Sequence, residues 1–327
     1  MKSTAQGSSG PMIEAPMRRR LLAAFSQAVL PAMALGRPIE ADAADLREQA
    51  SGQPAAETLS VLRSRLELQF ATALSPSLQA AARTWVRTSA DAVARYFGRF
   101  PVPRVDLLLV AEDGRGILGA VTYDEPSLLI RIRLGRETTE VQFLEDQMLV
   151  HEMVQLAIPR IPRSQNWLRE GVASYVEGVA RCRVGLVAPA TVWRRWAEEM
   201  PQGQPRAGDA GLDHAATWAR ARWGGAIFCL LADVELLRRS SQRQGLQQAL
   251  QGVLAAGGHC GVSWSVDRIL STADASVGRT TLTDLYRRMK DSPEPVDLDG
   301  LWRSLGIAGI APDEDAPLAK VRRAILS

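Results

Sequence analysis

The sequence predicts an α+β fold in which a small mixed sheet precedes an all-helical C-terminal half. Two patterns indicate this order. Between residues 58 and 138, apolar residues alternate or form short runs, which is typical of strands, around one helical stretch. From residue 139 to residue 327, they recur at steps of three and four, which is typical of helices. The chain has 327 residues and is 46% hydrophobic, so it can bury a sizeable core.

Residues 1–34 are predicted to form a leader segment, and residues 35–57 a linker. The stretch "MRRRLLAAFSQAVLPAMALG" begins with basic residues, continues with apolar ones and has small residues at Ala32 and Ala34. That order is typical of an export signal, and the apolar part is too short for a membrane span. We therefore expect a periplasmic or secreted protein with no membrane span in the mature chain. An ordinary polar N-terminus is the alternative.

Charge and cysteine content exclude two classes of protein. The formal net charge is +3, and residues 1–34 carry all of it, because Lys2 and three arginines stand there against Glu14. The remainder is neutral, which argues against a nucleic-acid partner. Three cysteines cannot form a disulfide-rich scaffold, and their spacing matches no metal motif. They allow at most one internal disulfide, among Cys182, Cys229 and Cys260.

The first part of the folded region is expected to contain the sheet. Residues 59–70 partly alternate, and residues 77–98 have helical spacing with Gly98 as the stop. Residues 104–110 form a short apolar run that predicts a buried strand. In "SLLIRIRLG", Ile130 and Ile132 alternate with Arg131 and Arg133, which predicts a half-exposed strand at the edge of the sheet.

A single buried helix is predicted over residues 140–158. One stripe of it carries Val141, Leu144, Met148, His151 and Gln155. Proline 159 ends it, because the residue before a proline is pushed out of helical geometry. Further helices are expected at 167–181, 190–200, 218–239, 246–255, 263–272, 281–289 and 318–326.

The segment "HEMVQ" within this helix has the spacing of a metal site. Residues four apart lie on the same face of a helix, so His151 and Gln155 point together, and Glu152 lies beside them. Two side chains can hold one metal ion at this spacing while the adjacent carboxylate holds a water. Glu170, at the start of the next helix, is the candidate for the third ligand. Gly171 beside it allows two helices to approach closely.

Together, "HEMVQ" and "WLREGVASYVE" resemble the catalytic core of the gluzincin zinc metallopeptidases, in particular the peptidase MA-like domains related to the zinc aminopeptidases. In that family H-E-x-x-H is followed by W-L-x-E-G-x-A-x-Y-x-E. Downstream, "RWGGA" is similar to the family's Y-x-K-G-A helix. The resemblance covers about residues 100–290 and implies a zincin-like fold, with the sheet over an active-site helix.

The resemblance implies a role for each site residue. His151 and Glu170 are zinc ligands, Glu152 is the general base, and Gln155 stands where the family has its second histidine ligand. Arg222 stands where the family has the tyrosine that supports the oxyanion, and an arginine can also donate hydrogen bonds to an oxyanion. A glutamine amide suits Mg²⁺ or Ca²⁺ better than zinc, so we expect zinc to be weakly bound or absent.

Two further residues are candidates for completing the site. Tyr123 is a second candidate for holding the oxyanion. His214 either replaces a missing group or is a surface histidine.

Three functions remain open from the sequence. The first is a degenerate or weakened metallopeptidase domain that acts on or binds peptides in the cell envelope. The second is an active zinc peptidase that uses His151, Glu170 and a substitute third ligand. The third is a non-catalytic module that binds a peptide or protein. In each, the strand at 128–134 is expected to lie beside the bound peptide.

Overall fold

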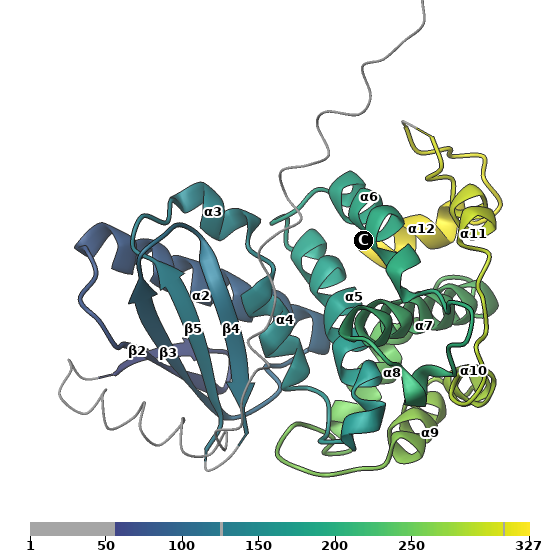
Figure 1. Cartoon of the computed structure of the whole chain (residues 1–327), viewed down its shortest axis with the longest axis horizontal. Helices are drawn as coiled ribbons and strands as arrows, with labels where there is room; N and C mark the ends of the chain where they lie inside the picture. Colours follow the sequence, from purple (N-terminus) through teal and green to yellow (C-terminus); the bar gives the residue numbers. More distant parts are fainter. Residues whose placement is uncertain (1–55, 125–126, 310) are drawn as a thin grey trace, which may run out of the picture.

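The computed structural model describes residues 56–124, 127–309 and 311–327. The predicted leader and nearly all of the predicted linker lie outside these ranges. The prediction of an α+β fold is confirmed, with a five-stranded mixed sheet followed by a helical C-terminal half (Figure 1). Within the described ranges, no helix combines the length and apolar character needed to cross a membrane.

The sheet has the strand order β1-β2-β3-β5-β4. β1 and β2 form an antiparallel hairpin, and β3 is parallel to both β2 and β5. β4 is antiparallel to β5 and forms one edge. The strands are β1 (Glu57–Val61), β2 (Ser64–Phe70), β3 (Arg104–Glu112), β4 (Ile117–Tyr123) and β5 (Leu129–Gly135).

The prediction that β5 is an edge strand is wrong. β5 lies between β3 and β4, and the edge on that side of the sheet is β4, which the sequence did not predict. The alternation in β5 reflects its two faces, because Ile130 and Ile132 belong to the main core whereas Arg131 and Arg133 lie on the other face. A strand with one covered face alternates in the interior of a sheet as well as at its edge.

Helix α2 (Pro76–Phe97) covers one face of the sheet (Figure 1). Its first turn is capped by Ser75, whose hydroxyl accepts a hydrogen bond from the backbone N–H of Leu78. It ends at Gly98, whose φ of 75° is a left-handed conformation that favours glycine. The buried residues of α2 join those of β2, β3 and β5 in the main hydrophobic core.

The single helix predicted over 140–158 is two helices, α3 (Glu140–Glu145) and α4 (Met148–Gln155). The break lies at Asp146. The carboxylate of Asp146 accepts hydrogen bonds from the backbone N–H groups of Met148 and Leu149 and so caps the first turn of α4. The predicted stripe is therefore interrupted. Val141 and Leu144 are each 60% exposed, whereas His151 and Gln155 are buried.

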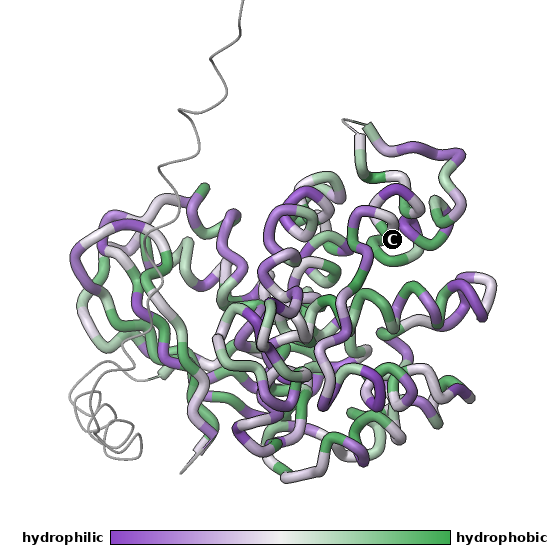
Figure 2. Tube along the Cα trace, turned by 45° about the vertical axis from the view of Figure 1, so that its right-hand side comes forward, coloured by the Kyte–Doolittle hydropathy of each residue, from purple (hydrophilic) through white to green (hydrophobic). Residues whose placement is uncertain are grey.

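The helical half is organised around α5 and α7, which pack against each other through two glycines. A Cβ atom on Gly171 would lie 2.3 Å from the Cα of Gly225, so the two backbones touch. Apolar and hydrophilic positions alternate along the helices of this half (Figure 2). The helices are α5 (Trp167–Arg183), α6 (Pro189–Glu199), α7 (Trp218–Arg239), α8 (Leu246–Ala255), α9 (Val266–Ser276), α10 (Thr281–Met289), α11 (Leu298–Leu305) and α12 (Ala319–Leu326).

The three cysteines are free thiols in the interior of the protein. The disulfide that the sequence left open does not form among them. Burial raises the pKa of Cys182, that of Cys229, and that of Cys260 to about 11. A thiol with a raised pKa is a poor nucleophile at neutral pH, so these residues do not support cysteine-based catalysis.

Candidate functional site

Helices α4 and α5 bring together the three residues named as metal ligands. The Nε2 atom of Gln155 lies 3.0 Å from Nε2 of His151 and 3.2 Å from Oε1 of Glu170. The Nε2 atom of His151 lies 3.4 Å from Oε2 of Glu170. His151 and Gln155 are one helical turn apart, as their spacing predicts, and the first turn of α5 supplies Glu170 opposite them.

The Gln155 amide connects the two other members of this cluster. Its –NH₂ group has two hydrogens, so it can donate one hydrogen bond to the carboxylate of Glu170 and another to Nε2 of the His151 tautomer in which that nitrogen carries no hydrogen. Burial raises the pKa of Glu170, but contacts with His151 and the charges of Arg222 and Arg169 together lower it below its usual range. Glu170 is therefore a carboxylate that accepts this hydrogen bond at neutral pH.

The donor set of the cluster does not fit zinc. Zinc sites in proteins use three or four His, Cys, Asp or Glu ligands, and no such group of three occurs among the residues that the structure describes. The Nδ1 atom of His151 is buried without a hydrogen-bond partner in the same set of residues. A metal-bound histidine normally donates from its second nitrogen to a carboxylate or carbonyl, which fixes the ring for the metal.

Glu152 lies between the cluster and the edge strand. Its Oε2 atom accepts a hydrogen bond from Oγ1 of Thr122 in β4, at 2.6 Å. Burial raises the pKa of Glu152, although His151 and the Thr122 hydrogen bond partly offset that effect. Glu152, which the resemblance names as the general base, therefore lies beside the edge strand and within hydrogen-bonding distance of Thr122.

Arg222, on α7, lies on the Glu170 side of the cluster. Its guanidinium carbon is 4.9 Å from the ring centre of Trp218 and 5.1 Å from that of Trp223. Its charge contributes to the lowered pKa of Glu170. The arginine that stands where the resemblance implies a tyrosine is thus a cation in contact with two indole rings.

Two residues considered in the sequence analysis lie away from the cluster. Tyr123 packs with Leu108 and Leu129 on the opposite face of the sheet from Thr122, so the expectation that it holds an oxyanion is wrong. His214 is 60% exposed at its side chain and lies 3.8 Å from Asp291. It is a surface histidine in this structure and does not complete the site.

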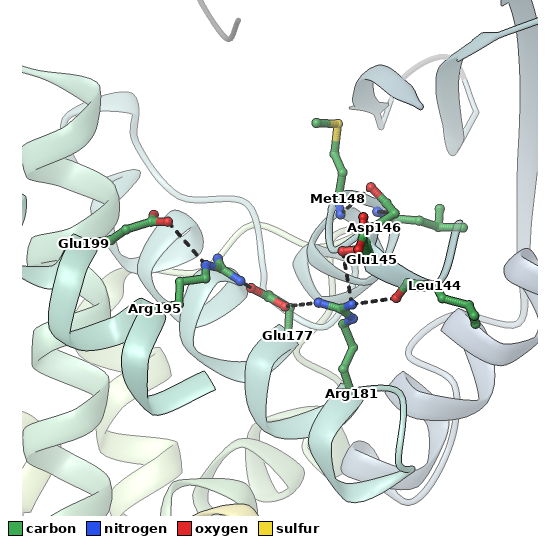
Figure 3. A network of polar contacts seen from close by, with 9 residues as sticks. Leu144, Glu145, Asp146, Met148, Glu177, Arg181, Arg195 and Glu199 are labelled. Carbon is green, nitrogen blue, oxygen red and sulfur yellow. Dashed lines mark hydrogen bonds and ion pairs between the residues drawn. The ribbon is translucent and has the colours of Figure 1, made fainter. Parts of the chain in front are cut away.

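A buried ion network, which the sequence analysis did not predict, supports the start of α4 (Figure 3). Glu177 on α5 is fully buried and forms ion pairs with Arg195 of α6 and, at 3.7 Å, with Arg181. Arg181 donates to the backbone carbonyl of Leu144 at 3.0 Å, at the end of α3 and just before the Asp146 cap. The network therefore fixes α5 and α6 relative to the turn from which the His151 helix begins.

Structural comparison finds solved structures with a similar fold. No family model and no curated protein matches the sequence. The structure is similar to that of an aminopeptidase N family protein from Idiomarina loihiensis, with a TM-score of 0.59 and 12% identity over 77% of this chain and 49% of that one. A second similar structure is an M1 zinc metallopeptidase from Deinococcus radiodurans, with a TM-score of 0.47 and 17% identity over 74% of this chain and 53% of that one.

The chain thus spans about half the length of these two solved structures, which it matches at low identity. The first of these similarities shows the fold alone, which resembles that of the aminopeptidase N family protein.

Proposed function

We propose that the protein is a peptide-binding domain with a zinc-aminopeptidase fold, in which a hydrogen-bonded cluster has replaced the catalytic metal. The observation that carries this proposal is the position of Gln155, whose amide nitrogen contacts both His151 and Glu170. A metal ion bound by these two residues would have to displace both hydrogen bonds. The third ligand for that ion would be only the neutral amide oxygen of Gln155, which is a weak zinc ligand.

The edge of the sheet supports the binding of an extended peptide. In the described part of the chain, β4 pairs only with β5, so its other side presents unpaired backbone N–H and C=O groups. β4 also carries Thr122, which contacts Glu152 of α4, so this edge lies directly beside the cluster. An extended peptide can add to such an edge as a further strand.

The location that we propose for this function is the cell envelope. The support is the order of basic, apolar and small residues between positions 17 and 36. Protein purified from its native cells should then begin near Leu35 when its intact mass is measured. A full-length form confined to the cytoplasm would contradict this location.

A weakened peptidase is the second candidate, because Glu152 keeps a raised pKa and a position facing the edge strand. Both candidates are tested by incubating the protein with a pool of synthetic peptides, with and without added zinc, and analysing the products by mass spectrometry. Our proposal expects peptides that are retained but not cut, with no difference between the unmodified protein and Glu152→Gln. Cleavage that requires zinc and disappears in Glu152→Gln would establish the peptidase instead.

A further inference from the structure

A cavity of about 420 Å³ lies between α2, α3 and the first turn of α4. α2 contributes Ala81 and Trp85 to its wall, α3 contributes Phe143, and α4 contributes Val150. Among the described residues that line it, none belongs to the cluster around Gln155. An apolar cavity of about 150 Å³ can hold a benzene molecule, so this cavity has room for a compound of two fused rings.

The wall of the cavity is mainly apolar and includes two aromatic rings. The ring centres of Trp85 and Phe143 are 5.2 Å apart, and both side chains are buried. Leu144 also lines the cavity and is largely exposed, so this apolar side chain stands where the cavity meets solvent. A wall of this kind favours a ligand with an apolar ring system.

One hydrogen-bond donor in the wall has no partner. Trp85 is 5% exposed, and its indole Nε1 is buried without a hydrogen-bond partner among the described residues. Burial raises the pKa of Asp146, which also lines the cavity, and the indole N–H of Trp85 is among the groups that partly offset this rise. The N–H therefore faces the Asp146 carboxylate without forming a hydrogen bond of normal geometry to it. A buried donor without an acceptor is unfavourable, so such a group usually has a water or a ligand as its partner.

The carboxylate of Asp146 can accept a further hydrogen bond. Its two oxygens each accept one, from the backbone N–H groups of Met148 and Leu149, both at 3.1 Å. An ionised carboxylate has about four acceptor sites, so each oxygen retains one. A hydroxyl group is both a donor and an acceptor, so a hydroxyl between the two residues would accept from the indole and donate to the carboxylate.

The buried charges of the wall balance each other, which favours a neutral ligand. The wall contains the carboxylate of Asp146 and the guanidinium of Arg181. Arg181 is already engaged, because it forms an ion pair with Glu177 at 3.7 Å and donates to the backbone carbonyl of Leu144 (Figure 3). Glu140 also lines the cavity but is exposed, so solvent screens its charge. An anion would be repelled by Asp146, and a cation would be repelled by Arg181.

We propose that this cavity is a binding site for a neutral ring compound that carries a hydroxyl group, which is to say a cyclic or aromatic alcohol. The ring system of the ligand lies against Trp85 and Phe143. Its hydroxyl bridges the indole N–H of Trp85 and the carboxylate of Asp146. This site is separate from the peptide-binding edge proposed at β4, so either one can exist without the other.

Three naphthalene compounds that differ only in their head group test this proposal. They are 2-naphthylmethanol, 2-ethylnaphthalene and 2-naphthylmethylamine, which is a cation at neutral pH. Their dissociation constants with the full-length protein are measured by equilibrium dialysis. The alcohol should bind about tenfold more tightly than either of the others, because it alone forms both hydrogen bonds without adding a charge. An apolar cavity that did not recognise the hydroxyl would instead prefer 2-ethylnaphthalene, since burying an unpaired hydroxyl is unfavourable.

Variants assign the binding to this cavity. Trp85→Phe keeps an aromatic ring but removes the N–H, so it should weaken binding of the alcohol about fivefold and change that of 2-ethylnaphthalene by less than about twofold. Ala81→Phe places a large side chain in the cavity and should abolish binding of both compounds. Arg87→Phe adds the same side chain at an exposed position of α2 and should behave like the unmodified protein. Unfolding curves identify a variant that has lost its fold, and the three compounds on the unmodified protein then carry the test.

Several results would overturn the inference. Binding of none of the compounds at its solubility limit would show that the cavity holds water alone. Equal or tighter binding of 2-ethylnaphthalene or the amine would exclude recognition of a neutral hydroxyl. Binding of the alcohol that is unchanged in Ala81→Phe would place it elsewhere on the protein, and a preference for the alcohol that is unchanged in Trp85→Phe would exclude the indole as its donor.

Discussion

Two glycines on α5 provide a matched test of the packing that places Glu170 opposite α4. A Cβ atom on Gly171 would lie 2.2 Å from the backbone carbonyl carbon of Gly225, whereas a Cβ atom on Gly178 would lie 3.1 Å from the side chain of Val192. Ordinary van der Waals contact begins at 3.4 Å, so Gly171→Ala requires a movement of 3.4 − 2.2 = 1.2 Å between two backbones. Gly178→Ala requires only a few tenths of an ångström from a side chain.

Both substitutions gain about 1 kcal/mol in helix propensity, so this term cancels in the comparison. Overpacking that shifts backbone costs about 1–3 kcal/mol or more. We therefore expect the free energy of unfolding to be at least about 2 kcal/mol lower for Gly171→Ala than for Gly178→Ala. Urea unfolding followed by circular dichroism measures the difference, provided that the m-values agree. Equal stability of the two variants would show that α5 and α7 are not in backbone contact.

Two further predictions concern the start of α4. Glu177→Leu leaves Arg181 and Arg195 without their buried partner, so it should lower the free energy of unfolding by about 3–5 kcal/mol. The control Glu198→Gln, which changes an exposed residue, should lower it by less than about 0.5 kcal/mol. Urea unfolding measures both variants, and a loss below about 1 kcal/mol for Glu177→Leu would contradict the role of the network. Asp146→Ala removes the cap of α4 and should cost about 1 kcal/mol, whereas Asp146→Asn should cost less because it keeps an acceptor. Burial raises the pKa of Asp146, which means that the buried negative charge of this residue opposes folding. This destabilising effect of the charge is present above the raised pKa and is lost as the pH falls toward the pKa of the unfolded chain, which is about 3.9. The stability of the unmodified protein should therefore gain on that of Asp146→Asn as the solution is acidified, and parallel pH profiles would contradict this.

Elements with strong local signals could be predicted from the sequence. The helical spacing of α2 ends at Gly98, and the structure has its left-handed cap there. The apolar run of β3 is buried on both faces at the centre of the sheet, which is why it lacks alternation. The edge strand β4 gave no such signal, because it contains Gly119 at an irregularity and the half-exposed Val121. The division into α3 and α4 depends on one carboxylate, and residue periodicity does not reveal it.

The site could be predicted where it depends on helical geometry. His151 and Gln155 meet because they are four residues apart, and the family pattern placed Glu170 opposite them. The contact between Thr122 and Glu152 joins residues 30 positions apart, so it depends on strand register. The same register turned Tyr123 away from the site, since adjacent residues of a strand face opposite sides.

The central claim is that the Gln155 amide takes the place of a metal ligand, and zinc content tests it most directly. The unmodified protein and Gln155→His are each loaded with zinc, dialysed against EDTA and analysed by inductively coupled plasma mass spectrometry. We expect the unmodified protein to retain almost no zinc. Gln155→His should retain close to one zinc per chain, because it restores three ligands and should raise the affinity by about two orders of magnitude or more. One zinc per chain retained by the unmodified protein would contradict the claim.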